Sequence, residues 1–179
     1  MAISSVCLFC GSRTGHNPAY SRLAEELGTL LAKRGVTLVF GGGSVGLMGV
    51  AARAARQAGG EVIGIVPRAL TRVEPAQQGL SELVLVETLH ERKALMHARS
   101  AAVVALPGGI GTMDELFEMM TWRELGIHDK PIWLLGVDGF WAPFLALLEH
   151  IAGEGLAPPN LMGLCEPLAS LDDLAARLG

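Results

Sequence analysis

The stretch VFGGGSVGLMG, residues 39–49, combines the end of an apolar run, a cluster of glycines and the beginning of a helix-like segment. Its glycines include the spacing Gly41-x-Gly43-x-x-Gly46, which is typical of the turn that holds a dinucleotide at the start of a helix. Glycines let the backbone approach a phosphate closely, and the free N–H groups at a helix start favour an anion. The stretch therefore predicts a strand, a phosphate-binding turn and a helix.

The rest of the chain repeats this unit, because short apolar β-branched runs alternate with longer segments of 3.6-residue periodicity. Strands are expected at 4–10, 36–40, 62–66, 83–86, 102–106 and 131–136. Helices are expected at 18–34, 46–58, 90–100, 112–125, 140–153 and 171–178, with a loop at 74–79. The first helix has the clearest boundaries, with Asn17 as N-cap, Pro18 at its first position and Gly35 just past its end. The pattern predicts an α/β fold of three layers, a mostly parallel sheet with helices on both faces, in a single domain over 1–179.

Composition limits the location and the partners of the protein. Half of the 179 residues are hydrophobic, yet no uninterrupted apolar run approaches the roughly 20 residues of a membrane helix. The N-terminus has no basic region of a signal peptide, so a soluble, cytoplasmic protein without a membrane partner is expected. Fourteen Lys and Arg stand against eighteen Asp and Glu, without a basic run. A nucleic-acid polymer is therefore not expected as a partner.

The cysteines and histidines do not indicate a metal. Cys7 and Cys10 have a C-x-x-C spacing, but they lie inside an extended apolar run rather than at a helix start. Together with Cys165 they are expected to be buried structural thiols. The five histidines show no zinc-ligand spacing, and neither a metal nor a cofactor is expected.

A dinucleotide site is not expected, because no acidic residue lies where it could bind the ribose. A dinucleotide site needs an acid at the end of the next strand, about 20 residues after the glycines, to hold the ribose hydroxyls. Glu61 has nearly that spacing, but it opens the run EVIGIV, whereas the ribose would lie at the far end near Pro67. A complete strand and helix also precede the fingerprint, which normally follows the first strand. Redox chemistry on a dinucleotide is therefore not expected, and no GxxxxGKS or GxxxxGKT run indicates an ATP-hydrolysing P-loop.

Three glycine-containing turns, at 10–12, 41–43 and 107–112, each follow an expected strand. The carboxyl ends of parallel strands form one edge of a sheet, where ligands bind in open α/β folds, so these turns predict a phosphate cradle. The candidate binding residues are Gly11, Ser12, Gly42, Gly43, Gly108, Gly109, Ile110, Gly111 and Thr112. The alternative is that the glycines only allow tight strand-to-helix turns.

Charged residues accompany the cradle. Glu115 follows the glycines of PGGIGTMDE by one helical turn, beside whatever they hold; it could equally close a capping box with Thr112. Arg92 and Lys93, in HERK at 90–93, begin a helix at the same edge and would face an anionic ligand. The alternative is that both are solvated surface cations, although cations in a first helical turn oppose the helix dipole.

The combination of GGGSVGLMG, HERK, PGGIGTMDE and TWRELGIHDKP resembles the LOG family, the cytokinin riboside 5'-monophosphate phosphoribohydrolases, once labelled lysine decarboxylases. The match runs from Cys10 to about Gly155. The resemblance implies a Rossmann-like fold, a homodimer, and hydrolysis of the N-glycosidic bond of AMP or N6-substituted AMP, which releases the free base and ribose 5-phosphate. Nothing in the sequence identifies a lysine for pyridoxal phosphate, so the decarboxylase label has no chemical support.

Carried over by the resemblance, the catalytic residues are Arg92 and Glu115. The implied nucleotide contacts are Glu74, Lys93, Gly109, Ile110, Gly111, Thr112, Met113, Asp114 and Thr121. The chain departs from the family pattern at Leu89, where Met is usual, and at Ala101, where Asp is frequent. The first is a tolerable hydrophobic exchange, and the second could alter local support or substrate preference.

The expected chemistry passes through an oxocarbenium-like state, by analogy with glycoside hydrolysis. Glu115 could stabilise that cation and orient or deprotonate water, whereas Arg92, a poor proton donor, would stabilise charge and position the ligand. Glu74 could hold the ribose hydroxyls or approach as a second carboxylate. Two other functions are possible: a non-catalytic carrier of a phosphate-bearing ligand such as molybdenum cofactor, and a nucleotide-sensing protein without turnover.

The helix expected at 112–126 is apolar over more than one face. Its hydrophobic residues are Leu116, Phe117, Met119, Met120, Trp122 and Leu125. Packing on the sheet alone would leave hydrophobic surface in water, so a partner helix in a homodimer is expected to cover it. The alternative is a helix wholly buried within one subunit.

Overall fold

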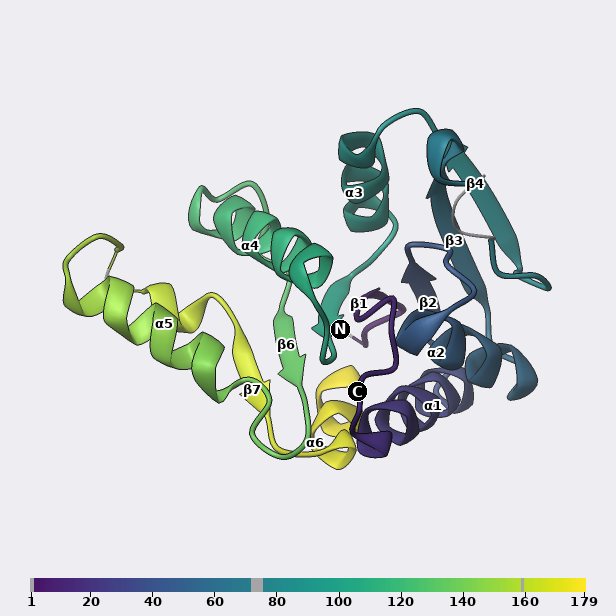
Figure 1. Ribbon diagram of the computed structural model, residues 1–179, viewed down its shortest axis with the longest axis horizontal. Helices are drawn as coiled ribbons and strands as arrows, with labels where there is room; N and C mark the ends of the chain where they lie inside the picture. The colour runs from purple at the N-terminus through teal and green to yellow at the C-terminus, as the bar shows by residue number, and fades with distance from the viewer. Residues whose placement is uncertain (1, 72–75, 159) are drawn as a thin grey trace.

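A seven-stranded parallel sheet forms the centre of the protein in the computed structural model, which describes residues 2–71, 76–158 and 160–179 (Figure 1). The strands are β1 (Ser5–Phe9), β2 (Thr37–Phe40), β3 (Val62–Pro67), β4 (Glu82–Val86), β5 (Ala102–Ala105), β6 (Ile132–Leu135) and β7 (Glu166–Leu168). Their order is β4-β3-β2-β1-β5-β6-β7. The central strand β1 pairs Val6 with Leu38 on one side and with Ala102 on the other.

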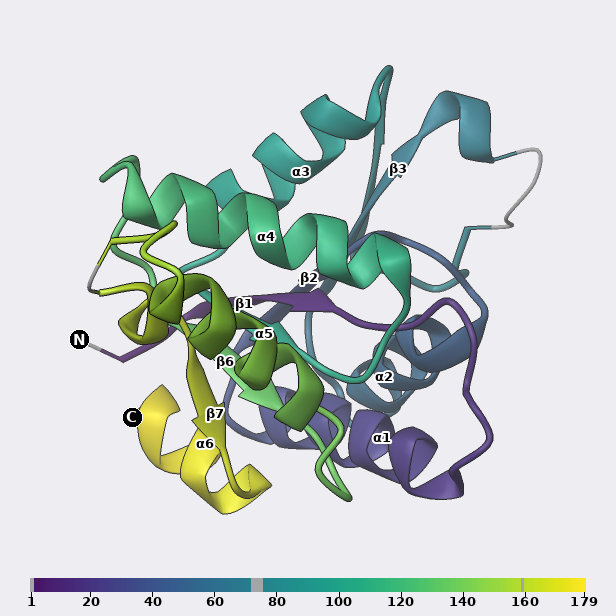
Figure 2. The ribbon, with the colours of Figure 1, turned by 60° about the vertical axis from the view of Figure 1, so that its left-hand side comes forward.

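Six helices cover the two faces of the sheet. They are α1 (Pro18–Lys33), α2 (Gly46–Gln57), α3 (Leu89–Ala98), α4 (Ile110–Glu124), α5 (Ala142–Gly153) and α6 (Leu171–Leu178), with short 3₁₀ turns η1 (Arg68–Leu70) and η2 (Leu161–Gly163). Residues of α1, α2 and α6 pack into the core on one face, and residues of α3, α4 and α5 pack into the core on the other (Figures 1 and 2). This arrangement confirms the expected three-layer α/β fold.

The element boundaries follow from local chemistry. Asn17 accepts a hydrogen bond from the Ala19 N–H at 2.9 Å and caps α1, as expected. The sequence did not indicate β7, since three residues with a central Pro167 lack the length and the backbone donor of a typical strand. Cys7, Cys10 and Cys165 are buried free thiols, as predicted.

Strand order places the ligand-binding edge. The chain moves from β1 outward to β4 and then returns to β5, which lies on the opposite side of β1. A crevice opens outside the carboxyl ends of the strands at such a switch point. The loops that follow β1 and β5 therefore face each other there, with the beginnings of α2 and α4 beside them.

Two properties of the described residues bear on membrane and metal binding. Among them, no helix is both long enough and apolar enough to cross a membrane. The same part of the chain holds no group of three or more His, Cys, Asp or Glu side chains that could bind a metal ion.

Candidate active site

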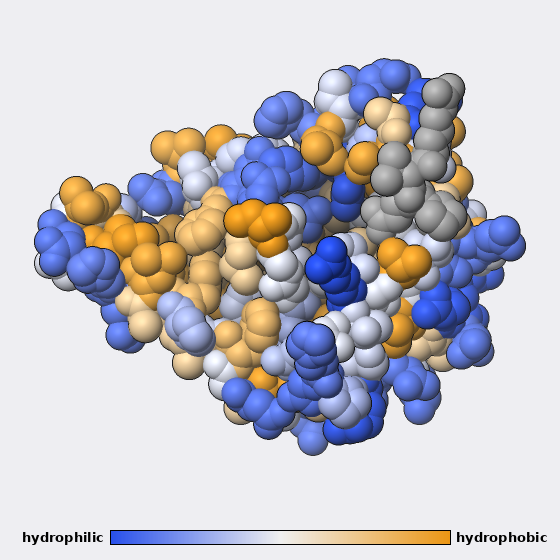
Figure 3. Space-filling view, viewed as in Figure 1, coloured by the Kyte–Doolittle hydropathy of each residue, from blue (hydrophilic) through white to orange (hydrophobic). Residues whose placement is uncertain are grey.

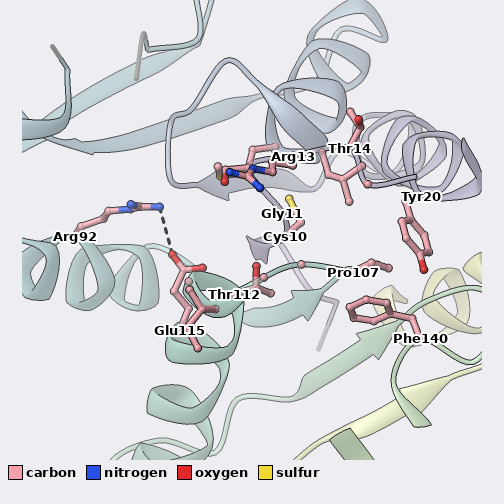
Figure 4. A pocket seen from close by; sticks show the side chains of 18 residues that line it. Cys10, Gly11, Arg13, Thr14, Tyr20, Arg92, Pro107, Thr112, Glu115 and Phe140 are labelled. Atoms are coloured by element: carbon pink, nitrogen blue, oxygen red, sulfur yellow. Dashed lines mark hydrogen bonds and ion pairs between the residues drawn. The ribbon is translucent and has the colours of Figure 1, made fainter. Parts of the chain in front are cut away.

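A cavity of about 630 Å³ lies at the switch point between β1 and β5. Its walls come from the loop after β1, the start of α2, the loop after β5 and the first turns of α4, with single residues from α1, α3 and the loop before α5. Figure 4 shows Arg92 and Glu115 at one end of the view and Tyr20 and Phe140 at the other. The lining residues are Cys10, Gly11, Ser12, Arg13, Thr14, Gly15, Tyr20, Leu47, Met48, Arg92, Pro107, Gly108, Gly109, Ile110, Gly111, Thr112, Glu115 and Phe140.

Three loops are joined beneath this cavity by backbone hydrogen bonds. The Gly11 N–H donates to the Pro107 carbonyl at 3.0 Å, and the Leu47 N–H donates to the Gly11 carbonyl at 2.9 Å. Gly46 has a positive φ of 62°, and a Cβ there would lie 2.2 Å from the carbonyl carbon of Ser12. Only glycine allows the turn before α2 to approach the loop after β1 this closely, so close packing and hydrogen bonds hold these segments together.

The three glycines at 41–43 allow close contacts with neighbouring parts of the protein. A Cβ on Gly41 would lie 1.9 Å from an Nη atom of Arg92, and one on Gly42 would lie 2.2 Å from the side chain of Val66. Gly43 forms an isolated antiparallel bridge with Ala76. Gly42 and Gly43, expected to bind the ligand, are not among the residues that line the cavity. Gly41 and Gly42 instead make room for the side chains of Arg92 and Val66.

The beginning of α4 presents free backbone donors to the cavity. Its N-cap is Gly109, which has no side-chain cap, and the first bond back to it comes from the Met113 N–H at 3.1 Å. The N–H groups of Ile110, Gly111 and Thr112 therefore have no partner within the helix, and the positive end of the helix dipole lies with them. The capping-box interpretation is wrong, because the helix begins before Thr112 and the Glu115 carboxylate binds Arg92 instead.

Arg92 and Glu115 form an ion pair at one end of the cavity. An Nη atom of Arg92 lies 3.2 Å from Oε1 of Glu115, and each side chain is only 13% exposed. Burial raises the pKa of the Glu115 carboxyl to about 7, although Arg92 opposes the shift. Arg92 Nε is buried without a hydrogen-bond partner among the described residues. A carboxylate with a pKa near neutrality, beside a cation, suits proton transfer at physiological pH.

Lys93, the other expected cation, points elsewhere. Its Nζ lies 3.1 Å from Oδ2 of Asp114 and 3.0 Å from Oε2 of Glu118, and Lys93 is buried. Burial alone would lower its pKa, but Glu118 and Asp114 raise it above the usual value. Lys93 joins α3 to α4 and is not among the residues that line the cavity.

The other expected contacts divide into three groups. Gly11, Ser12 and the run Gly108–Thr112 line the cavity, whereas Met113, Asp114 and Thr121 do not. Glu74 lies outside the described residues.

Sequence reasoning missed several lining residues, of which Arg13, Tyr20 and Phe140 have the most chemical character. Arg13 directly follows an expected binding residue, which was an available signal. Tyr20 and Phe140 meet edge to face, with ring centroids 5.7 Å apart, only because β1 and β6 lie near each other in the sheet. No local pattern around either aromatic residue indicates that contact.

The fold and the cavity together define a class: a Rossmann-like protein with a pocket at the switch point, a helix N-terminus suited to an anion and a buried carboxylate of raised pKa. A family described as possible lysine decarboxylase matches residues 48–178. The chain belongs to this family, the LOG family.

Relatives of known name share most of the chain. A probable cytokinin riboside 5'-monophosphate phosphoribohydrolase of Oryza sativa subsp. japonica is 49% identical over 150 residues, 84% of this chain and 67% of the relative. A cytokinin riboside 5'-monophosphate phosphoribohydrolase of Rhodococcoides fascians is 46% identical over 156 residues, 87% of this chain and 79% of the relative. Among solved structures, the molybdenum cofactor carrier protein of Chlamydomonas reinhardtii has a TM-score of 0.72 at 22% identity, covering 97% of this chain and 94% of that one, which shows a shared fold.

Proposed function

We propose that this protein hydrolyses the N-glycosidic bond of a nucleoside 5'-monophosphate, either AMP or N6-substituted AMP, and releases the free base and ribose 5-phosphate. The observation that carries the proposal is the buried Arg92–Glu115 pair beside the free N-terminus of α4. The names of the relatives from Oryza sativa and Rhodococcoides fascians support the same activity.

The geometry of α4 suggests how the substrate lies. The free N–H groups of Ile110, Gly111 and Thr112 would bind the 5'-phosphate, as helix N-termini do. Glu115 follows Gly111 by four positions and therefore lies on the same side of the helix, one turn further along. Because a ribose ring separates the phosphate from C1', a phosphate at the helix start brings C1' toward Glu115. Remote binding energy would then position the reacting carbon.

Glu115 and Arg92 have different roles in the proposed reaction. As a carboxylate, Glu115 stabilises the developing positive charge on the ribose and takes a proton from the attacking water, whose oxygen bonds to C1'. The bond between C1' and the base breaks, its electron pair leaves with the base, and the proton from Glu115 can neutralise that base. Arg92, a permanent cation, orients the carboxylate and stabilises charge. No metal or cofactor takes part in this proposal.

The first experiment is a direct assay. Purified protein is incubated with AMP and with N6-isopentenyl-AMP, and the free base and ribose 5-phosphate are measured by chromatography. Release of both products, lost in Glu115→Gln, supports the proposal. Tight binding of either nucleotide without release of base refutes it and favours the carrier or sensor alternatives, which the carrier-like fold keeps open.

We further propose that the whole chain works as one cytoplasmic nucleotide-binding domain and as a homodimer that buries one side of α4. Leu116, Met119 and Met120 are buried within the subunit, but Leu125 is 68% exposed and Phe117 is partly exposed beside Phe144. Hydrophobic residues gather over α4 and α5 at the left of the surface view (Figure 3). A second copy could cover these side chains.

The dimer is tested at an exposed position, because a charge at the buried Met120 would damage the core itself. Leu125→Glu is expected to reduce the mass in light scattering from about twice 18.8 kDa to that of one chain. Leu83→Glu, on the edge strand β4, is the matched control and should leave the mass unchanged. A wild-type mass of one chain at micromolar concentration, with full activity, would refute the dimer.

A further inference from the structure

The loop after β1 carries an arginine, Arg13, that has no hydrogen-bond or ion-pair partner in residues 2–71, 76–158 and 160–179. Of the ten arginines among the described residues, eight donate hydrogen bonds to carbonyl groups or carboxylates. The other two, Arg13 and Arg22, make no such bond within the described part of the chain. Arg22 lies on the outer side of α1, whereas Arg13 lines the cavity. Arg13 is therefore a cation in the cavity wall that no described protein group neutralises.

The backbone that carries Arg13 is held in place. The Gly11 N–H donates to Pro107, the Gly11 carbonyl accepts from Leu47, and Gly46 packs directly on the carbonyl group of Ser12. In the close view, Arg13 lies on the opposite side of the cavity from Thr112 (Figure 4). A hydrogen-bonded loop that carries a cation without a partner among the described residues is an arrangement suited to an incoming anion.

The negative charge of the proposed ligand exceeds the positive charge that the N-terminus of α4 supplies, so a further cation would stabilise the bound phosphate. A phosphate monoester carries about −1.5 to −2 at neutral pH, whereas one helix N-terminus supplies only about half a positive charge. Arg92 is not free for this task, because its guanidinium is confined between the Glu115 carboxylate and the backbone of Gly41. Lys93 is bound to Asp114 and Glu118 outside the cavity lining. Among the described residues, Arg13 is thus the remaining cation in the lining.

We infer that Arg13 is a specificity-determining residue that closes on the 5'-phosphate from the side opposite the N-terminus of α4. This inference rests on the proposed function only for the identity of the ligand as a nucleoside 5'-monophosphate. The planar guanidinium can donate two parallel hydrogen bonds to two phosphate oxygens, which a lysine cannot do. Arg13 thereby selects phosphorylated ligands, while Arg92 and Glu115 act on the bond to the base.

The test separates phosphate binding from chemistry. Calorimetry with AMP is performed on Glu115→Gln protein, in which turnover is expected to be at least about 100-fold slower, with and without Arg13→Ala. Loss of a charged hydrogen-bonding partner at an exposed position is expected to raise the Kd of AMP about tenfold. The affinity for adenosine, which lacks the phosphate, should change less than about twofold. Arg13→Lys should recover part of the loss, and Arg22→Ala, an equally unpaired arginine, should change neither Kd.

Kinetics supply the second readout. In otherwise wild-type protein, Arg13→Ala should raise the KM for AMP about tenfold and leave kcat within about threefold. An unchanged Kd for AMP, an equal loss of affinity for AMP and adenosine, or a fall in kcat without a change in KM would each overturn the inference. If wild-type protein releases no base but Arg13→Ala still weakens AMP selectively, the hydrolase proposal fails and the role of Arg13 stands.

Discussion

Two consecutive residues of α3, Arg92 and Lys93, make three ion pairs with α4, and they form two separate contacts. Arg92 pairs with Glu115 at 3.2 Å, whereas the next residue, Lys93, pairs with Asp114 and Glu118 at 3.1 and 3.0 Å. One step along a helix rotates a side chain by about 100°. That rotation places the first pair in the cavity and leaves the second contact outside its lining.

The two contacts differ in the solvation of their acids. Arg92 and Glu115 are both 13% exposed, and burial raises the pKa of Glu115 to about 7. In the other contact, Asp114 is 65% and Glu118 is 21% exposed, and burial lowers the pKa of Lys93 less than the two acids raise it. Similar charges in adjacent positions thus yield the pair that we propose to be catalytic, inside the cavity, and a contact outside the cavity lining. The position of Glu115 in the cavity and its raised pKa distinguish the first pair.

Replacement of Glu115 should have the largest effect. We expect Glu115→Gln to keep the fold and most of the affinity for AMP while kcat falls by at least about 100-fold, because a positioned acid–base group is lost. Steady-state kinetics and circular dichroism measure the two properties. Near-normal turnover in Glu115→Gln would show that Glu115, like Lys93, has only a structural role.

Arg92→Ala should reduce kcat/KM about 100-fold, the scale observed when one group that stabilises transition-state charge is removed. Its control needs an arginine without structural bonds. Arg56 is unsuitable because its guanidinium holds the carbonyl groups of Gly60 and Gly79. Arg22→Ala is the appropriate comparison, and equal losses in the two variants would contradict the assignment of Arg92.

Lys93→Met should show the reverse profile, with a larger effect on stability than on chemistry. We expect kcat/KM to fall less than about tenfold and the free energy of unfolding to fall by about 2 kcal/mol, since removal of one partner leaves a partly buried carboxylate unpaired. Urea denaturation monitored by fluorescence measures the stability. A loss of activity as large as that of Arg92→Ala, with unchanged stability, would show that Lys93 acts on the substrate.

The smallest expected effect is the response to pH. If the carboxylate form of Glu115 is active and its pKa is about 7, the active fraction falls as pH decreases through 7. We expect kcat/KM for AMP to fall about fivefold between pH 7 and pH 6, since that profile reports the pKa of the free enzyme. AMP binding to Glu115→Gln gives the separate contribution of the substrate phosphate, which titrates near pH 6. A kcat/KM that stays constant down to pH 5 would contradict the raised pKa.

The amino-acid sequence by itself determined the layered fold and much of the site. Among the described residues, a 3.6-residue periodicity predicted the six helices, and short apolar runs predicted six of the seven strands, because buried surfaces need apolar residues at regular positions. The glycine turns after β1 and β5 and the charged pair Arg92 and Glu115 were visible because parallel strands bring their carboxyl ends to one edge.

Only the tertiary structure decided how those residues share the work. In the structure, Gly41 leaves space for the guanidinium of Arg92, and Lys93 forms an ion pair with Glu118. The structure also places Arg13, Tyr20 and Phe140 in the cavity wall. These roles depend on side-chain direction and on the order of strands in the sheet, which join segments far apart in the chain. Such contacts cannot be predicted from the local sequence around each residue. The raised pKa of Glu115 cannot be predicted from it either, because it follows from burial in the tertiary structure.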